Sequence, residues 1–353
     1  MDFIITLSII FTTVYSFGFI ISNLLYGKKK IDVFFQVLIG YIFIGSTTVV
    51  FHFFFNINNF YSLSIIFFGL FFFVLNYSKI NKLEYFKLIV IVIISSFILV
   101  GYSDHSIDAN MYHHPYVSYL KSEKIIFAIA NIQFRFGHIS FLQYVQASLS
   151  NDYFDLISLA SLNIIFYVCF ILFLFREIIN TRKINIVFIV KILFGSFLLI
   201  KFARYREYGN DLIPLLVSIY FLINILNLSK NKFFSKKDLI NISLPFLAFM
   251  FVHKISYVFA FLIFLPLFNF KNLKFLYEIK LVYFLIFLTI LIPWSAKNYF
   301  VTSCLAYPVE LSCYSNSLYE LSGASEPKKR ILVNGNMGES FYRPSKLAGN
   351  RFK

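Results

Sequence analysis

Long apolar runs separated by short polar segments make up most of this chain of 353 residues. Phe3–Tyr26 and Val33–Phe55 are two such runs, and each reaches the roughly 20 residues that a helix needs to cross a bilayer. Because only helices and closed barrels satisfy the backbone inside a membrane, the pattern predicts an all-α, polytopic transmembrane helical bundle. The expected spans, about ten, are residues 3–26, 33–55, 60–76, 87–101, 154–175, 185–202, 211–228, 239–252, 255–270 and 281–300.

The basic residues between these runs fall in every second loop. They are Lys28–Lys30; Lys79, Lys82 and Lys87; Arg176, Arg182 and Lys183; Lys230, Lys232, Lys236 and Lys237; and Lys271, Lys274 and Lys280. Loops rich in Lys and Arg remain in the cytoplasm, so these loops are expected inside, and the N-terminus and the intervening loops outside. Residues 102–153, residues 204–211 and the pair His253-Lys254 would then share the outer face and are expected to form one cavity.

The longest polar interruption, residues 102–153, contains most of the candidate chemistry. Four of the six histidines of the chain lie there. A membrane protein places charges sparingly, because each desolvated charge costs several kcal/mol unless it is paired or hydrated. The segment therefore predicts a functional site, and its candidate residues are Asp104, Asp108, His113, His114, Arg135 and His138.

The same pattern divides the chain into four regions. Residues 1–101 form an N-terminal four-span region, and residues 102–153 an extracytoplasmic functional loop. Residues 154–300 form a six-span region, and residues 301–353 an extracytoplasmic loop and tail.

The functional loop is expected to carry short helices. Asp104 and Asp108 are four residues apart and would share one face of a helix. Pro115 disfavours helical geometry at His114, so a kink or a break is expected at that point. Further along the loop we expect an interfacial helix at 116–124, an ordered re-entrant loop at 131–137 and a second interfacial helix at 141–149.

Composition and charge exclude other classes of protein. Hydrophobic residues make up 59% of the chain and charged residues 14%, which is too few charges to cover a soluble domain of this size. The net charge is +15, but the cations are spread over the loops, as expected of topology determinants. A nucleic-acid partner would need basic residues gathered on a soluble face, so none is expected.

A set of motifs carries a family resemblance. The motifs are Asp108…Tyr112-His113, Ala130-Asn131, Arg135-Phe136-Gly137-His138, Glu207-Tyr208-Gly209-Asn210-Asp211, Lys254-Ile255-Ser256, and Pro293-Trp294…Lys297-Asn298-Tyr299 with Cys304…Tyr307-Pro308…Cys313. Over about residues 100–315 they resemble bacterial membrane proteins encoded with surface-polysaccharide genes. Those proteins look like GT-C-type glycosyltransferases of lipid-linked sugars and include candidate O-antigen polymerases. The chain differs from that pattern because four predicted spans precede the acidic loop, where GT-C proteins usually have one.

The resemblance implies a function and a location. The chain is expected to be a membrane glycosyltransferase or polymerase that acts on polyprenyl-pyrophosphate-linked sugars in O-antigen-type polysaccharide synthesis. Its expected location is the bacterial inner (plasma) membrane. Its expected partners are the lipid-linked oligosaccharide, membrane lipid, and a chain-length regulator or a flippase.

Sugar transfer of this kind needs a base near the acceptor hydroxyl and cations near the departing pyrophosphate. By the resemblance Asp108 would be the base, with Asp104 as its partner or alternative; otherwise these carboxylates cap a helix or stay solvated. Arginine and lysine bind phosphate oxygens, although either can instead anchor to lipid headgroups. The expected substrate-binding residues are His113, His114, Arg135, His138, Arg206, Asp211 and Lys254.

No cofactor is indicated. A divalent metal on Asp104, Asp108, His113 and His114 is an open alternative, but their spacing matches no strong metal signature. Under the predicted topology Cys304 and Cys313 lie outside, in an oxidising compartment, and we expect them to form a disulfide.

Two other classes of function compete with the transferase. One is a flippase or transporter of the same lipid-linked oligosaccharide, which would line a central cavity with charges along several spans. Here the charges gather on one face, which favours a one-sided enzyme. The other is a ligase or acyltransferase of the same pathway, which the sequence distinguishes poorly.

Overall fold

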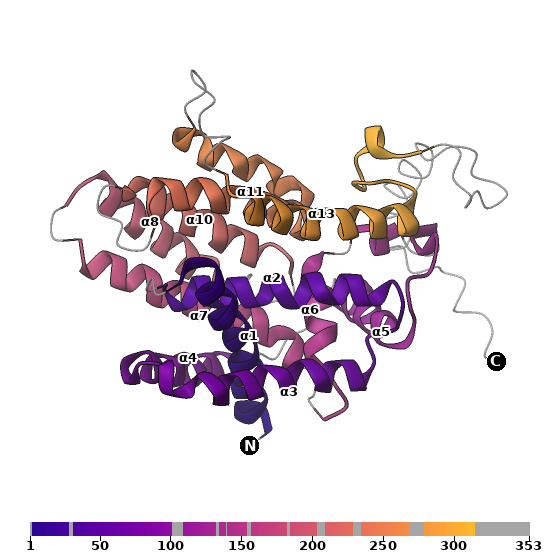
Figure 1. Ribbon diagram of the computed structural model, residues 1–353, viewed down its shortest axis with the longest axis horizontal. Helices are drawn as coiled ribbons and strands as arrows, with labels where there is room; N and C mark the ends of the chain where they lie inside the picture. Colours follow the sequence, from indigo (N-terminus) through magenta and orange to yellow (C-terminus); the bar gives the residue numbers. More distant parts are fainter. Residues whose placement is uncertain are drawn as a thin grey trace, which may run out of the picture. The chain divides into compact units, whose positions relative to one another are not determined.

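The computed structural model describes residues 2–27, 31–100, 109–131, 134–138, 140–153, 157–181, 184–202, 209–228, 234–268 and 279–314. Within these ranges every regular element is helical, so the predicted all-α class is confirmed (Figure 1). The elements are α1 (Asp2–Tyr26), α2 (Val33–His52), α3 (Asn59–Asn76), η1 (Tyr77–Lys79), α4 (Lys82–Val100), η2 (Ala109–His113), α5 (His114–Ser122), η3 (Ile129–Asn131), η4 (Phe134–His138), α6 (Phe141–Leu149), α7 (Ile157–Ile179), α8 (Ile186–Ile200), α10 (Leu212–Leu226), α11 (Lys236–His253), η6 (Ile255–Leu267), α13 (Leu281–Thr302) and η7 (Glu310–Ser312).

Each of the ten predicted apolar segments contains a helix of the structure. Five helices in the described residues are long and apolar enough to cross a membrane: Ile4–Tyr26, Val33–His52, Asn59–Lys79, Ser161–Ile179 and Leu281–Thr302. Three shorter apolar helices are Ile186–Ile200, Leu212–Leu226 and Ile255–Leu267. Large apolar side chains such as Phe67 on α3 and Leu193 on α8 are exposed, as on a surface that faces lipid. These helices indicate a membrane protein, and the count of about ten spans stays a prediction.

By packing, the chain forms two compact units. The first contains residues 1–124 and 140–294, and the second contains residues 125–139 and 295–353. The described residues of the second unit end at residue 314. The four regions drawn from the sequence follow the predicted topology, whereas these two units follow the packing. Helix α13 runs from the first unit into the second.

In the first unit, α1 crosses α2 and α3 (Figure 1). The crossing with α2 depends on Gly18 and Gly40. A Cβ at Gly18 would lie 1.7 Å from the carbonyl oxygen of Gln36, and one at Gly40 would lie 1.9 Å from that of Val14. Glycine therefore lets the two backbones touch, as small residues do in membrane helix pairs.

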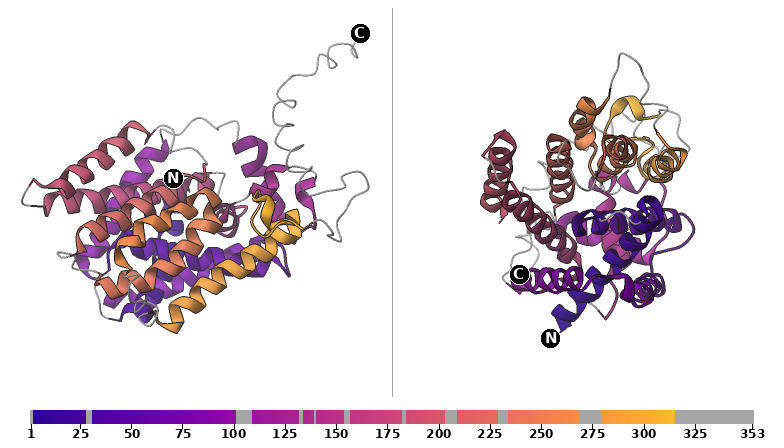
Figure 2. Two further views of the ribbon diagram at one scale, coloured as in Figure 1. Left: turned by 90° about the horizontal axis from the view of Figure 1, so that it is seen from above. Right: turned by 60° about the vertical axis from the view of Figure 1, so that its left-hand side comes forward.

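The first unit has two polar ends, and contacts between distant segments define each. At the end called here the basic end, the ring of Tyr26 lies 6.3 Å from that of Phe234, and Asn227 donates to the Glu177 carboxylate at 3.3 Å. Helices α7 and α8 form a hairpin at this end (Figure 2). Lys191 of α8 donates to the same Glu177 carboxylate at 3.2 Å.

At the other end, called the loop end, α2 and the segment that follows it meet α5. The Nδ2 of Asn56 donates to the Lys121 carbonyl at 3.1 Å, and the backbone N–H of Ile57 donates to the Leu120 carbonyl at 2.8 Å. Described residues that flank loops predicted to be cytoplasmic thus lie at one end, and described residues of loops predicted to be outside lie at the other. This is the arrangement that alternating spans require.

The functional loop can be compared with its predicted structure in several places. At His114, where a kink or a break was expected, the chain does not break, but it changes there from the π-helical turn η2 to the α-helix α5. Pro115 lies in the first turn of α5, where its missing N–H breaks no helical hydrogen bond. The helix predicted at 141–149 exists as α6, but all nine of its residues are buried, so it does not lie at an interface. The expected helix carrying Asp104 and Asp108 falls outside the described residues. The segment predicted to be an ordered re-entrant loop at 131–137 consists largely of the 3₁₀ turns η3 and η4.

Candidate functional site

A π-helical turn positions His113. The turn η2 covers Ala109–His113, and both of these residues are buried in the first unit. Turns of this type are rare and are frequent at functional sites, because they redirect side chains from the regular helical register. Asp108 and Asp104, the predicted base and its partner, lie outside the described residues, and Ala109 is the described residue that follows Asp108.

The buried helix α6 supplies the partner of His113. Ser140 caps α6 in a capping box with Gln143, whose Oε1 accepts from the Ser140 N–H at 3.0 Å and from its hydroxyl at 2.8 Å. Those contacts fix which end of the Gln143 amide is oxygen. Its Nε2 therefore donates, to His113 Nδ1 and, at 3.0 Å, to Asn210 Oδ1.

This hydrogen-bond direction sets the tautomer of His113. Since Nδ1 accepts from an amide N–H, the ring proton of neutral His113 must be on Nε2. Neutral His113 therefore carries its hydrogen-bond donor at Nε2 and its acceptor at Nδ1.

The segment before α10 carries the next polar groups. Asn163 of α7 donates to the Gly209 carbonyl at 3.1 Å, and the Tyr257 hydroxyl donates to the Asp211 carbonyl at 3.2 Å. Asp211 also forms an ion pair with Lys254, which follows the last residue of α11. The two charged side chains are 39% and 43% exposed, so the pair faces an accessible side of the protein.

We call His113, Gln143, Asn210, Asp211 and Lys254 the loop-end cluster. Its members come from the functional loop, from α6, from the segment before α10 and from the end of α11. The sequence predicted that the functional loop, residues 204–211 and His253-Lys254 would converge. The described members of these three segments do meet, through Gln143 and through the Asp211–Lys254 pair.

Two buried histidines hold the helices near the cluster. His253 Nε2 lies 3.0 Å from the Tyr41 hydroxyl in the interior of the unit. His52 Nε2 lies 2.9 Å from the Glu123 carbonyl, and its Nδ1 lies 3.3 Å from the Tyr144 hydroxyl. Burial raises the pKa of the Tyr144 phenol, which keeps that hydroxyl protonated and able to donate to His52.

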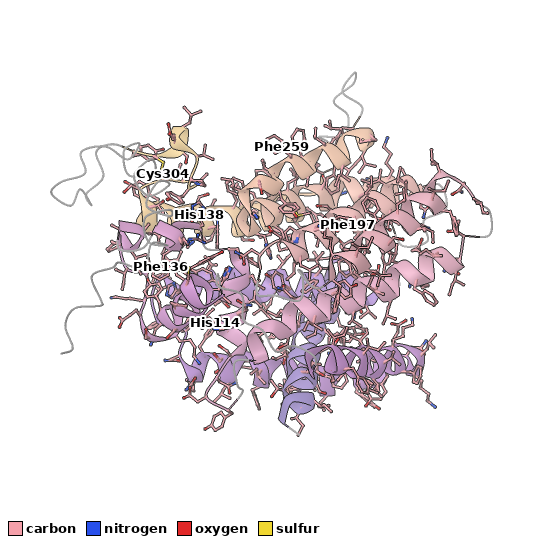
Figure 3. All side chains as sticks on the ribbon, turned by 180° about the vertical axis from the view of Figure 1, so that it is seen from behind. His114, Phe136, His138, Phe197, Phe259 and Cys304 are labelled. Carbon is pink, nitrogen blue, oxygen red and sulfur yellow. A yellow bond between two sulfur atoms is a disulfide. The ribbon has the colours of Figure 1, made fainter. Side chains whose placement is uncertain are left out.

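The other described candidate residues divide between the units. His114 is half-buried at the start of α5 in the first unit (Figure 3). Arg135 and His138 lie on η4 in the second unit, where the His138 ring is 4.8 Å from the ring of Tyr307. Arg206 falls outside the described residues.

A disulfide connects two residues of the second unit. Cys304 and Cys313, which were expected to pair, are bonded with an S–S distance of 2.09 Å. The Ala128 N–H donates to the Phe300 carbonyl at 2.8 Å, which ties the first segment of this unit to α13. Figure 3 shows Phe136, His138 and Cys304 at the same side of this unit.

Sequence reasoning missed two parts of the site. Gln143 and Asn163 are each 0% exposed and hold the cluster, but nothing in their spacing distinguishes them from other amides in apolar helices.

Within the described residues no group of three or more His, Cys, Asp and Glu side chains could hold a metal ion.

Comparison with known proteins gives a family and no activity. A family model described as "Domain of unknown function (DUF8201)" matches residues 1–322. No curated protein and no solved structure matches this chain.

Proposed function

The chain belongs to the family described as domain of unknown function DUF8201, and we propose that it is a multi-pass membrane glycosyltransferase. Its substrates would be sugars on polyprenyl pyrophosphate, and its product a surface polysaccharide of the O-antigen type. The site would face outward from a bacterial inner membrane. A flippase and a chain-length regulator are the proposed partner proteins.

One observation supports this proposal most. Three polar segments that are far apart in the sequence meet in the loop-end cluster, at one of the two polar ends of a bundle whose helices are mostly apolar. An enzyme that acts on a lipid-linked sugar needs this combination: apolar helix surface for the lipid, and polar groups at the depth of the lipid head.

The transfer itself can be written with residues of this chain. The acceptor hydroxyl attacks the anomeric carbon of the donor sugar, the bond from that carbon to the pyrophosphate oxygen breaks, and polyprenyl pyrophosphate leaves. Asp108 takes the hydroxyl proton, with Asp104 as partner or alternative, and such a base contributes typically 10²–10⁴-fold.

The cluster supplies the remaining roles. Lys254, held by Asp211, would neutralise the leaving pyrophosphate, and His113 would donate its Nε2 proton to a substrate oxygen. His114, Arg135, His138 and Arg206 remain proposed substrate contacts.

A complementation experiment tests the proposal. A deletion strain of the source bacterium would be complemented with each variant, and the long polysaccharide chains resolved as a ladder on a gel. Asp108→Asn keeps the side-chain shape and removes the base, so we expect normal protein level and loss of the ladder. Arg135→Lys distinguishes a bidentate phosphate contact, which would be lost, from a headgroup anchor, which would survive. A full ladder with Asp108→Asn at normal expression would remove Asp108 from the mechanism.

A transporter of the same lipid is the second candidate. The observation in its favour is that charged side chains, among them Asp32 and Arg176, also line a cavity at the basic end. A transporter would use polar groups at both ends of the bundle, whereas a transferase needs them at one.

A further inference from the structure

A large cavity in the first unit lies at the basic end, away from the loop-end cluster. It measures about 880 Å³ and lies between α1, the start of α2, α4 and α7. A space of this size can hold the polar head of a lipid and the first part of its chain.

The deep wall of the cavity is mostly apolar and carries one buried carboxylate. Tyr15, Phe34 and Ile91 line it and are almost fully buried. Asp32, only 5% exposed, also lines it, and its two oxygens accept from the Phe35 N–H at 3.1 Å and from the Tyr220 hydroxyl at 2.5 Å.

Positive charge exceeds negative charge on the lining. Lys79, Lys87 and Arg176 are its cations, and Asp32 and Glu84 its carboxylates, so three cations face two anions. Lys87 lies 2.6 Å from Glu84, and Asp32 already has its two donors. Burial raises the pKa of Asp32, which reduces the negative charge further.

The rim of the cavity continues into the apolar outer surface of α4. Leu83 and Phe86 both line the cavity and are 59% and 62% exposed. A ligand that enters here therefore meets cations and hydrocarbon together, a combination that suits an amphiphile with an anionic head.

We propose that this cavity binds the phosphate head of a membrane lipid, with Arg176 and Lys87 on the phosphate and the start of the lipid chain against α4. Either a phospholipid or a polyprenyl phosphate supplies this chemistry. The site is separate from the loop-end cluster: Asn163, which holds the cluster, and Arg176 are thirteen residues apart on α7, or about 20 Å along the helix.

The test is lipid binding by the full-length purified protein, measured by native mass spectrometry after delipidation in detergent. Phosphatidylglycerol, a polyprenyl phosphate, phosphatidylcholine and inorganic phosphate would be titrated separately. Arg176→Gln and Lys87→Gln each remove one cation from the lining. Lys237→Gln is the matched control, since this exposed residue of α11 lies at the same end and does not line the cavity.

We expect Arg176→Gln and Lys87→Gln to weaken binding of the phosphate lipids by about tenfold, the loss typical of one charged hydrogen bond, and Lys237→Gln to leave it unchanged. The tighter of the two anionic lipids identifies the source of the phosphate. If a cation variant fails to fold, Val90→Phe fills the apolar part of the cavity without changing charge and should weaken lipid binding as well. Equal binding by wild type, Val90→Phe and the cation variants would overturn the proposal, as would inorganic phosphate binding as tightly as the lipids.

Discussion

Gln143 shows how a single side chain can join segments that the sequence keeps far apart. It lies in α6 with no exposed surface, its oxygen bound by Ser140 and its nitrogen by His113 and Asn210. A buried amide without partners would cost about 1–3 kcal/mol, so these contacts also hold the cluster in one arrangement. The geometry of His113 therefore depends on Gln143.

Substituting Lys254 tests its proposed function, because the substitution should hardly change the stability of the protein. The Lys254–Asp211 pair is more than a third exposed, so Lys254→Met should change the free energy of unfolding by less than about 1 kcal/mol. If Lys254 neutralises the leaving pyrophosphate, polymer synthesis should fall by about 10²–10³-fold. The measurements are thermal unfolding in detergent and polymer yield in the complemented strain. Lys121→Met is the control, since Lys121 also lies at the loop end, 3.9 Å from Asp152; equal yields from the two variants would contradict the role of Lys254.

Asp32 predicts a pH dependence of stability. Burial raises its pKa above the ordinary value of 3.8, against the opposing hydrogen bond from Tyr220. The folded protein therefore keeps this proton over a pH range in which the unfolded chain has lost it. The stabilisation is complete below pH 3.8 and is lost as the pH rises through the folded-state pKa. Thermal unfolding from pH 4 upward should show this decline in wild type and a weaker decline in Asp32→Asn. The exposed Asp152→Asn should follow wild type, and an Asp32→Asn curve parallel to wild type would show that Asp32 does not titrate in this way.

At the scale of elements, the contact between α1 and α2 leaves no room for a side chain at Gly18 or Gly40. Ala normally stabilises a helix relative to Gly by up to about 1 kcal/mol. At Gly18 and Gly40, however, the added carbon would collide with the backbone of the partner helix. Gly18→Ala and Gly40→Ala should each lower the free energy of unfolding by about 1–3 kcal/mol or more.

The control for this prediction is Gly195→Ala in α8. A Cβ there would lie 3.3 Å from the end of the Leu174 side chain, which can move. Thermal unfolding of the purified variants should rank Gly195→Ala near wild type and the other two well below it. A Gly40→Ala protein as stable as wild type would mean that α1 and α2 do not touch.

The elements were more predictable than their surroundings. Long apolar runs predicted helices such as α2 and α3, because length and hydrophobicity are properties of the segment itself. The surroundings of α6 were not predictable: the segment was expected to be an interfacial helix, whereas Gln143 and Gln146 are buried, and their burial depends on partners from elsewhere. The segment 255–267 was expected to be an ordinary span and forms the 3₁₀ helix η6, for which the sequence offers no cue beyond Pro266.

The sequence predicted some of the charged residues described here, such as Lys254 and Asp211, but not others, such as Asp32. Lys254 and Asp211 are charged residues next to apolar helices. Because a charge near a membrane span is costly to desolvate, the sequence alone indicated both as candidate site residues. Asp32 was not marked, because it reads as the N-cap of α2, a role that it does fill. Its position in a cavity with Arg176 becomes evident only when α2, α4 and α7 are packed together.

At the scale of the whole molecule, the alternation of basic and non-basic loops predicts which end faces the cytoplasm. Reporter fusions at Lys30, Lys79, Lys183, Lys237 and Lys274 should all report cytoplasm. A fusion near Ser122, in the loop end, should report the outside, because α5 meets the segment after α2 there. A cytoplasmic signal at Ser122 would contradict an outward-facing site.

The central claim is that the loop-end cluster belongs to a transferase, and reconstitution tests it most directly. The purified protein would be placed in liposomes with an oligosaccharide on polyprenyl pyrophosphate, and the products measured by mass spectrometry. We predict lipid-linked chains that grow by whole repeat units with wild type, and no growth with an equal amount of Asp108→Asn. If wild type carries the labelled substrate across the bilayer without lengthening it, the protein is a transporter and the account is contradicted.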